Sequence, residues 1–594
     1  MSGKRPRAGP PVATLPLRQS AAAWLLDALV EHGVEYLFCN LGTDHAPLIE
    51  ALADARSRGR VVPQVVLCPH ENTAVHMAGG YAAATGRGQV VLVHVDAGTA
   101  NAAMGLHNLA RARIPLLVMA GRAPFSSRGE LPGGRDTYVH FVQEPFDQAG
   151  LVRPYVKWEL TLQAPEVTRE VVGRAHGVMH SDPMGPVYLM LPREVLAATC
   201  EPAPLWSLPS TRVGAVKAGG TGARVMHTLA ERLIAARDPL LVTAYAGRNP
   251  AAVGLLDRLA RMTGLRVCEF NTVHMNIPRD SPCFAGYQPA PFVETTDLGI
   301  LLDVDVPWIP RTTRDNPNAY WVQMDVDAIK RDMPMWSFPA DLRIEGDAAQ
   351  LLQQLIDAVE ALATPAFRDS VAQRLARLAG EHAQRTAAVA RLALDPGTPG
   401  QLNPHHVCAA LGRALGPHDI VLNEAIRNTA AVFEQIPRSE PGTLIGLPGG
   451  GLGFSGGMAL GHKLAYPARQ VVHVVGDGSF HFCNPSSLLA VARQYALPIL
   501  TVVLDNSGWA AVKDATLRMY PDGAAQQAGD FASQLAPGMD FAALAEAGGA
   551  FGERLVDPLD TEAAIARCFK ALRSGRSALL HVHLAPHQGT SSWK

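Results

Sequence analysis

Several features are missing from this 594-residue sequence, and each absence excludes a class of protein. No apolar run approaches the ~18–20 residues that span a bilayer, so no membrane partner is expected. Basic and acidic residues number 52 and 54, which leaves no excess of positive charge for nucleic acid. The eight cysteines form no CxxC pair, which is typical of buried thiols in a reducing compartment. The cytoplasm is therefore the expected location.

What the sequence does contain is the composition of a chain with large folded cores. The hydrophobic fraction is 48% and the charged fraction 18%. The basic segment 1–16 has no apolar stretch, so we expect a mobile tail there and not a secretion signal. No GxGxxG motif opens a strand–helix–strand unit in the right context, which argues against an NAD-binding domain.

Short β-branched runs alternate with Ala- and Leu-rich helical stretches along most of the chain. The runs expected to form strands are 34–42, 64–68, 89–95, 114–121, 185–192, 239–247, 298–305, 470–478, 498–506 and 578–584. This alternation predicts an α/β fold of three doubly wound parallel-sheet domains. Pro- and Gly-rich linkers at 201–222 and 394–404 place the domains at 17–200, 223–360 and 400–590, with a helical connector at 360–393. The first and last domains have similar patterns, which would suit a duplication.

Polar residues follow two of the predicted buried strands in the last domain. Gly476-Asp477-Gly478 follows one strand, and Asp505-Asn506 ends the next. Ligands of parallel α/β sheets bind beyond the carboxyl ends of strands. Asp477 and Asn506 offer hard oxygen ligands for Mg²⁺ or Ca²⁺, and the glycines let backbone approach a phosphate. The purely structural alternative is a glycine turn with a capping Asp.

These motifs resemble those of the thiamine diphosphate enzymes that include acetolactate synthase, benzoylformate decarboxylase and pyruvate decarboxylase, whose signature is GDG followed by Asn-Asn. Here Asp505 replaces the first Asn. The resemblance spans about residues 17–590 and implies pyrimidine-binding, central and diphosphate-binding domains. It implies that Asp477, Asn506 and the Gly508 carbonyl hold Mg²⁺ against the cofactor diphosphate. The neighbouring residues implied in cofactor binding are Gly476, Gly478, Ser479 and Trp509.

The stretch 67–88 resembles the family segment that carries the catalytic carboxylate, and Glu71 falls at that position. A carboxylate against the pyrimidine ring of thiamine promotes the proton loss that activates the cofactor. The alternative for Glu71 is a helix N-terminal acid. The Gly-rich stretch 446–461 resembles the segment that bends the cofactor, with Leu452 as its apolar wedge and Gly450 beside it. Glu424 is a weaker cofactor-binding candidate.

Residues 91–121 resemble benzoylformate decarboxylase more than acetolactate synthase. His94 then matches a proton-transfer His, and Thr43 a residue that binds the substrate carboxylate. A core His is the alternative for His94. Asp44, His45 and Asn101 are second-tier candidates, and His481 follows the metal motif where substrate would lie. In acetolactate synthase the middle domain binds FAD with a characteristic Arg-Phe-Asp-Asp stretch. Here that region reads Asp305-Val306-Pro307-Trp308, which argues against FAD without excluding it.

The resemblance implies an enzyme that decarboxylates a 2-oxo acid, joins it to a second carbonyl compound, or does both. It also implies a homodimer or homotetramer with active sites between subunits. The first rival is a lyase of the same family that cleaves a 2-hydroxyacyl-CoA or a diketone. The second is a non-catalytic cofactor-binding scaffold, against which the retention of Glu71, Asp477 and Asn506 argues.

Overall fold

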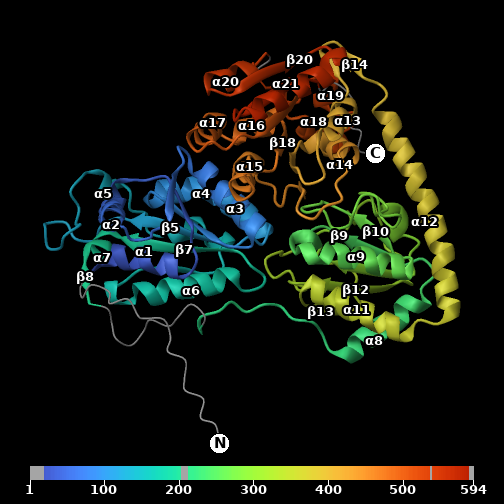
Figure 1. Ribbon diagram of the computed structural model, residues 1–594, viewed down its shortest axis with the longest axis horizontal. Coiled ribbons are helices and arrows are strands. Elements are labelled where there is room, and N and C mark those ends of the chain that lie inside the picture. Colours follow the sequence, from blue (N-terminus) through green and yellow to red (C-terminus); the bar gives the residue numbers. More distant parts are fainter. Residues whose placement is uncertain (1–18, 202–211, 536–537, 587–594) are drawn as a thin grey trace, which may run out of the picture.

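The computed structural model describes residues 19–201, 212–535 and 538–586, which form three α/β domains (Figure 1). The expected N-terminal tail, residues 202–211 of the 201–222 linker and the outermost residues of the first and last domains lie outside this range. In the described part of the chain, we find no helix with the length and apolarity needed to cross a membrane. All eight cysteines lie in the described part of the chain and are buried.

The N-terminal domain contains a six-stranded parallel sheet in the order β3-β2-β4-β5-β7-β6. The inner strands β4 and β7 are mostly apolar and are buried along their whole length because helices cover both faces of the sheet. The strands are β2 (Tyr36–Cys39), β3 (Gln64–Leu67), β4 (Gln89–Val93), β5 (Leu116–Arg122), β6 (Glu159–Thr161) and β7 (Pro186–Pro192). The helices are α1 (Ala21–Glu31), α2 (Ala46–Ser57), α3 (Glu71–Thr85), α4 (Val95–Arg111), α5 (Val139–Val142), α6 (Thr168–His180) and α7 (Arg193–Ala197). The two-residue strands β1 (Gln19–Ser20) and β8 (Thr199–Cys200) pair antiparallel.

The central domain has a five-stranded parallel sheet in the order β10-β9-β11-β12-β13. Its strands are β9 (Leu240–Thr243), β10 (Arg266–Glu269), β11 (Leu298–Leu302), β12 (Tyr320–Asp325) and β13 (Leu342–Glu345). Its helices are α8 (Ala223–Ala235), α9 (Pro250–Thr263), α10 (Ala290–Val293) and α11 (Ala348–Leu362). The long helix α12 (Pro365–Leu392) then runs along the outside of the molecule to the C-terminal domain (Figure 1).

The C-terminal domain repeats the topology of the N-terminal one. Its six-stranded parallel sheet has the order β17-β16-β18-β19-β21-β20. Taken in sequence order, β16–β21 occupy the same places in this sheet as β2–β7 occupy in the N-terminal sheet. The strands are β16 (Ile420–Glu424), β17 (Leu444–Ile445), β18 (Val471–Gly476), β19 (Leu500–Asp505), β20 (Phe551–Leu555) and β21 (Ala578–His583), after a small ribbon of β14 (Gly397–Thr398) and β15 (Gln401–Leu402). The helices are α13 (Pro404–Ala414), α14 (Thr429–Gln435), α15 (Phe454–Ala465), α16 (Asp477–Phe482), α17 (Pro485–Gln494), α18 (Ala510–Met519), α19 (Ala524–Ala528), α20 (Phe541–Ala547) and α21 (Thr561–Arg573). The shared order is what a duplicated domain would produce.

The predicted α/β class with three parallel-sheet domains is confirmed, and each of the ten predicted strand runs contains a strand. The predicted domain limits stay predictions.

Helices α3 and α15 join the first and last domains through glycine contacts. A Cβ atom on Gly80 would lie 2.3 Å from the carbonyl oxygen of Met458, and one on Gly461 would lie 2.2 Å from that of Met77. The two backbones can approach this closely only because side chains are absent at these positions. The crossing fixes the start of α3 close to the loop before α15.

We therefore expect Gly80→Ala to force the two helices apart. Overpacking of a close contact costs about 1–3 kcal/mol, and the free energy of unfolding should fall by at least that amount. Gly254→Ala is a matched control, because Gly254 also lies inside a helix and a Cβ atom there would meet nothing within 4 Å. Denaturant unfolding of both variants measures the difference, and equal stabilities would mean that the crossing tolerates a methyl group.

Candidate functional site

A cavity of about 330 Å³ lies at the carboxyl ends of β16, β18 and β19. This is the edge at which ligands of parallel sheets bind. All of its lining residues fall within 425–512, so among the described residues it belongs to the C-terminal domain alone. The predicted residues that line it are Leu452, Gly476, Asp477, Gly478, Ser479, Asn506, Gly508 and Trp509.

Three oxygen atoms converge at one end of this cavity. The side-chain oxygen of Asn506 lies 3.2 Å from Asp477 Oδ1 and 2.9 Å from the carbonyl oxygen of Gly508. The reversed amide would donate hydrogen bonds to both atoms, whereas the present orientation places acceptors face to face. A divalent cation among the three would stabilise this orientation, since neighbouring oxygens around octahedral Mg²⁺ lie about 2.9 Å apart. The donor set therefore suits Mg²⁺.

The two aspartates at this edge have opposite surroundings. Burial, followed by the charge of Asp505, raises the pKa of Asp477 to about 7. The carboxylate of Asp505 is also partly buried, but it accepts a 2.8 Å hydrogen bond from His581 and another from the Ser507 amide, and its pKa is lowered. Among the described residues, Asp477 thus has no cationic partner, and a bound cation would stabilise its charged form.

The rest of the cavity wall is mostly apolar, and glycines bring it close to the backbone. The indole of Trp509 packs on Gly478, where an added Cβ would lie 2.4 Å from Trp509 Cδ1. Gly453 has a φ of +89°, and a Cβ there would meet the carbonyl oxygen of Phe482 at 2.2 Å. This turn positions Leu452, the predicted wedge, against the cavity.

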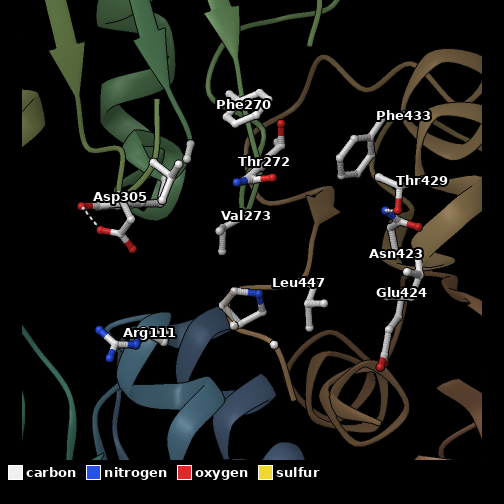
Figure 2. A pocket seen from close by; sticks show the side chains of 18 of the residues that line it. Arg111, Phe270, Thr272, Val273, Asp305, Asn423, Glu424, Thr429, Phe433 and Leu447 are labelled. Atoms are coloured by element: carbon white, nitrogen blue, oxygen red, sulfur yellow. Dashed lines mark hydrogen bonds between the residues drawn. The ribbon is translucent and has the colours of Figure 1, made fainter. Parts of the chain in front are cut away.

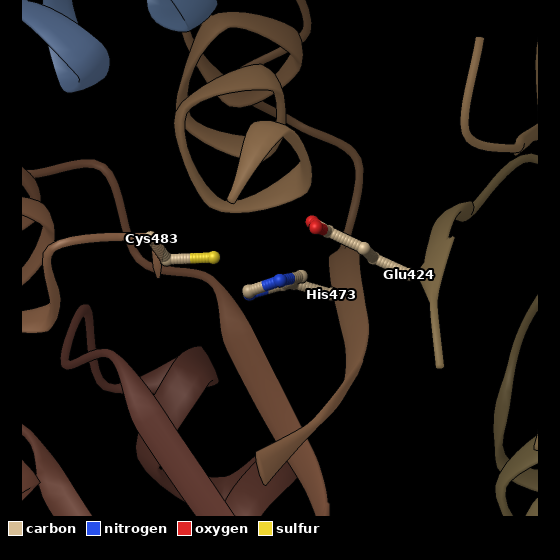
Figure 3. Close-up of side chains that lie close together, drawn as sticks. All are labelled: Glu424, His473 and Cys483. Atoms are coloured by element: carbon tan, nitrogen blue, oxygen red, sulfur yellow. The ribbon is translucent and has the colours of Figure 1, made fainter. Parts of the chain in front are cut away.

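Glu424 supports this loop from behind. Its buried carboxylate accepts hydrogen bonds from the amides of Gly453 and Ser455 and from the Ser455 hydroxyl. The same hydroxyl lies 2.7 Å from His473 Nε2, and Figure 3 shows Cys483 on the other side of this imidazole. Burial raises the pKa of Glu424 to about 7, against the effect of these hydrogen bonds. Within the chain, Glu424 therefore holds the start of α15 in place.

Gly450 lies outside the first cavity and lines a second one of about 530 Å³ between the three domains (Figure 2). Arg111 comes from the N-terminal domain, Phe270 and Asp305 from the central domain, and Phe433 from the C-terminal domain. Next to it, the fully buried ammonium of Lys330 lies 2.8 Å from Asp305 and 2.6 Å from Asp325.

The Lys330 network also includes Tyr245, whose hydroxyl donates to Asp325, and Arg113 of the N-terminal domain, which donates to Asp305 at 2.7 Å. It fills the carboxyl edge of the central sheet, where a nucleotide binds in open parallel sheets. Sequence reasoning did not find this network, because its members come from three strand ends and from another domain, which no local motif brings together.

Glu71 is the first residue of α3 and is buried. Its Oε2 accepts a 3.1 Å hydrogen bond from Asn101 Nδ2, while the next residue, Asn72, donates to the carbonyl oxygens of Gly453 and Phe482. Glu71 does not line the 330 Å³ cavity of its own chain.

His94 and Thr43 lie together at the carboxyl ends of β4 and β2, away from that cavity. His94 contacts Asp44 through Nδ1 and Gln143 through Nε2, and Thr43 lies 3.5 Å from His140 Nε2. Gln143 and His140 were missed by sequence reasoning because they lie at the end of, and within, the short helix α5, in a segment with no motif. His481 is exposed and packs against Phe541, with the ring centroids 5.4 Å apart, and it does not line the cavity.

Comparison with known proteins agrees with this geometry. Residues 19–151 match the N-terminal, and residues 428–582 the C-terminal, TPP-binding domain model of the thiamine pyrophosphate enzymes. Benzoylformate decarboxylase of Pseudomonas aeruginosa is 27% identical over 94% of this chain and 97% of its own. An acetolactate synthase large subunit of Escherichia coli, that of isozyme 3, is 27% identical over 95% of this chain and 94% of its own.

Among solved structures, the 4-hydroxybenzoylformate decarboxylase of Rhodococcus jostii shares the fold with a TM-score of 0.77 and 21% identity, over 96% of this chain and all of its own. Benzoylformate decarboxylase of Polynucleobacter necessarius gives a TM-score of 0.75 at 19% identity, over 96% of this chain and 99% of its own. Both domain models that match the chain are thus those of thiamine pyrophosphate enzymes, and the relatives it resembles are of the acetolactate synthase and benzoylformate decarboxylase type.

Proposed function

We propose that the chain binds thiamine diphosphate with Mg²⁺ and acts on a 2-oxo acid by decarboxylation, by carboligation, or by both. The observation that carries the proposal is the 330 Å³ cavity with three converging oxygens at one end and an apolar wall beside them. Asp477, Asn506 and the Gly508 carbonyl hold the metal. Gly476, Gly478 and Ser479 contact the diphosphate, and Leu452 and Trp509 contact the organic part of the cofactor.

When bound, thiamine diphosphate supplies an electron sink that accepts the electron pair of the bond to the leaving carboxylate. The chain's own residues prepare and surround it. Glu71 holds a proton at a ring nitrogen of the pyrimidine, and Asn101 orients its carboxylate. Thr43 and His94 face the substrate. Glu424 acts indirectly, through the loop that carries Leu452. We assign no role to His481 beyond its packing on Phe541.

The functional unit contains at least two copies of the chain, as a homodimer or a homotetramer, with each active site between subunits. Glu71, His94 and Thr43 do not line the C-terminal cavity of their own chain, so a second copy supplies them. The N-terminal domain also exposes a group of large apolar side chains in one segment, which is typical of a protein interface. They are Phe125, Tyr138, Phe141, Val142 and Phe146. The buried cysteines, none of which forms a CxxC pair, fit a cytoplasmic enzyme.

The test is carbon dioxide release by the purified chain with thiamine diphosphate and Mg²⁺. The acids compared are pyruvate, 2-oxobutyrate, branched 2-oxo acids and phenylglyoxylate. We expect release from at least one acid and none above background from Glu71→Gln. The relatives named as benzoylformate decarboxylases favour an aromatic acid. No release from any acid despite cofactor binding would contradict the proposal and favour cleavage of an acyl thioester or a diketone.

A further inference from the structure

The imidazole of His94 is held at both ring nitrogens by oxygen atoms. Nδ1 forms a short contact with a carboxylate oxygen of Asp44, and Nε2 lies 2.8 Å from the side-chain oxygen of Gln143. Both of these oxygens accept hydrogen bonds, so with the Gln143 amide in this orientation both ring nitrogens donate. Only the doubly protonated imidazolium has two N–H groups.

Asp44 has the surroundings of a fixed negative charge. Its side chain has no exposed surface, and its second oxygen lies 3.1 Å from Nε2 of His45, which is equally buried. Burial acts to raise the pKa of Asp44, but the nearby imidazoles of His45 and His94 outweigh it and hold that pKa below its usual range. The hydrogen bond to Asp44 is in turn the main reason that the pKa of His94 is raised.

We propose that Asp44 is a positioning residue that keeps His94 doubly protonated, so that His94 meets the substrate as a cation and a proton donor. The inference rests on the proposed function for its chemical consequence. The proton on Nε2, now directed at Gln143, passes to the substrate. The proton on Nδ1 stays on the ring, in the hydrogen bond to Asp44, and solvent reprotonates Nε2. A cationic ring also attracts the carboxylate of a 2-oxo acid, which a neutral imidazole would not.

The other charges near the ring do not reverse this effect. Asp96, on the same helix, raises the pKa of His94 further. Across the site, burial and the charge of Arg193 lower the pKa of His140. The residues facing the pair are thus Asp44, His45, Asp96, His140 and Arg193.

The contribution of the Asp44–His94 pair to the stability of the fold should depend on pH. The pKa of His94 is raised on folding, so its contribution is complete below the ordinary histidine pKa and is lost as pH rises through the folded value. The pKa of Asp44 is lowered, so its contribution is present above the ordinary aspartate pKa and is lost as pH falls through the folded value. The pair therefore stabilises the fold most between about pH 4 and pH 6.5.

The experiment compares the wild type with Asp44→Asn in two measurements. The first is the titration of His94 in the cofactor-free protein, followed by NMR of ¹³Cε1-labelled histidine and assigned with His94→Gln. The second is the pH profile of kcat/KM on the preferred acid. We expect Asp44→Asn to titrate at lower pH and to lose about 10²-fold in kcat/KM near pH 8, with a much smaller loss near pH 5.5. Asp96→Asn removes a nearby charge without removing the hydrogen bond and should change both measurements less.

Two results would overturn the inference. The first is that His94 of the wild type titrates at or below the ordinary histidine pKa. This measurement needs no Asp44 variant, so it still tests the inference if Asp44→Asn fails to fold. The other is a loss of activity that is uniform over pH with an unchanged His94 titration, as a merely structural Asp44 would give. A high His94 titration that falls in Asp44→Asn, without turnover of any acid, would support the pairing and contradict the proposed function.

Discussion

Glu71→Gln should abolish most turnover while leaving the fold and cofactor binding nearly unchanged. Glutamine has the same shape, and its carbonyl oxygen can still accept the 3.1 Å hydrogen bond from Asn101. It cannot take up or release a proton at the pyrimidine ring. Groups that transfer a proton in this way contribute about 10²–10⁴-fold to rate, and we expect kcat to fall within that range.

Cofactor binding and kcat must be measured on the same preparation. Tryptophan fluorescence reports cofactor binding through Trp509, which lines the cavity, and carbon dioxide release gives kcat. Glu50→Gln, an exposed position on α2, controls for the loss of one negative charge. A Glu71→Gln variant with near-normal kcat would overturn the assignment. Weak binding with near-normal kcat at saturation would make Glu71 a binding residue only.

The same variant can show whether the active site lies between subunits. When Glu71→Gln and Asp477→Asn chains assemble at random, half of the dimers are mixed, and each mixed dimer has one site with both residues intact. About a quarter of the wild-type activity should therefore return, although each variant alone is inactive. If Glu71 and Asp477 served one site within a single chain, every site would carry a lesion and mixing would restore nothing.

Some of this architecture is encoded locally and could be predicted from the sequence. Buried parallel strands are short, continuous apolar runs, and for this reason β4, β7 and β18 were predictable. The Gly476-Asp477-Gly478 turn and Asn506 could be predicted to meet because both follow neighbouring strands. The shorter or more polar strands, such as β6 and β13, carry no such signal.

The surroundings of His94 show what could not be predicted. Asp44 was only a second-tier candidate, and nothing in the sequence places Gln143, 49 residues further along, against the same ring. That contact depends on the path of an irregular segment across the end of the sheet, which periodicity does not encode. The same holds for the network around Lys330, in which Asp305 of the central domain contacts both Lys330 and Arg113 of the N-terminal domain. Tertiary contacts of this kind decide the charge of a side chain, and motifs identify only its type.

Asp477→Asn should remove Mg²⁺-dependent binding of thiamine diphosphate without harming the metal-free fold. Asparagine keeps the shape of the side chain and removes a buried carboxylate that has no cationic partner in the part of the chain that the structure describes. The metal-free variant should therefore be at least as stable as the wild type, which separates loss of binding from loss of folding.

In the wild type, cofactor and Mg²⁺ at 100 times the dissociation constant should raise the free energy of unfolding by about 2.7 kcal/mol. In Asp477→Asn most of this gain should vanish, as it should for the wild type in EDTA. The exposed Asp522→Asn is the charge-matched control and should keep the full gain. If Asp477→Asn is stabilised as much as the wild type, the three converging oxygens do not hold the metal. Asp505 is a poor substitute, because its carboxylate already accepts hydrogen bonds from His581 and Ser507.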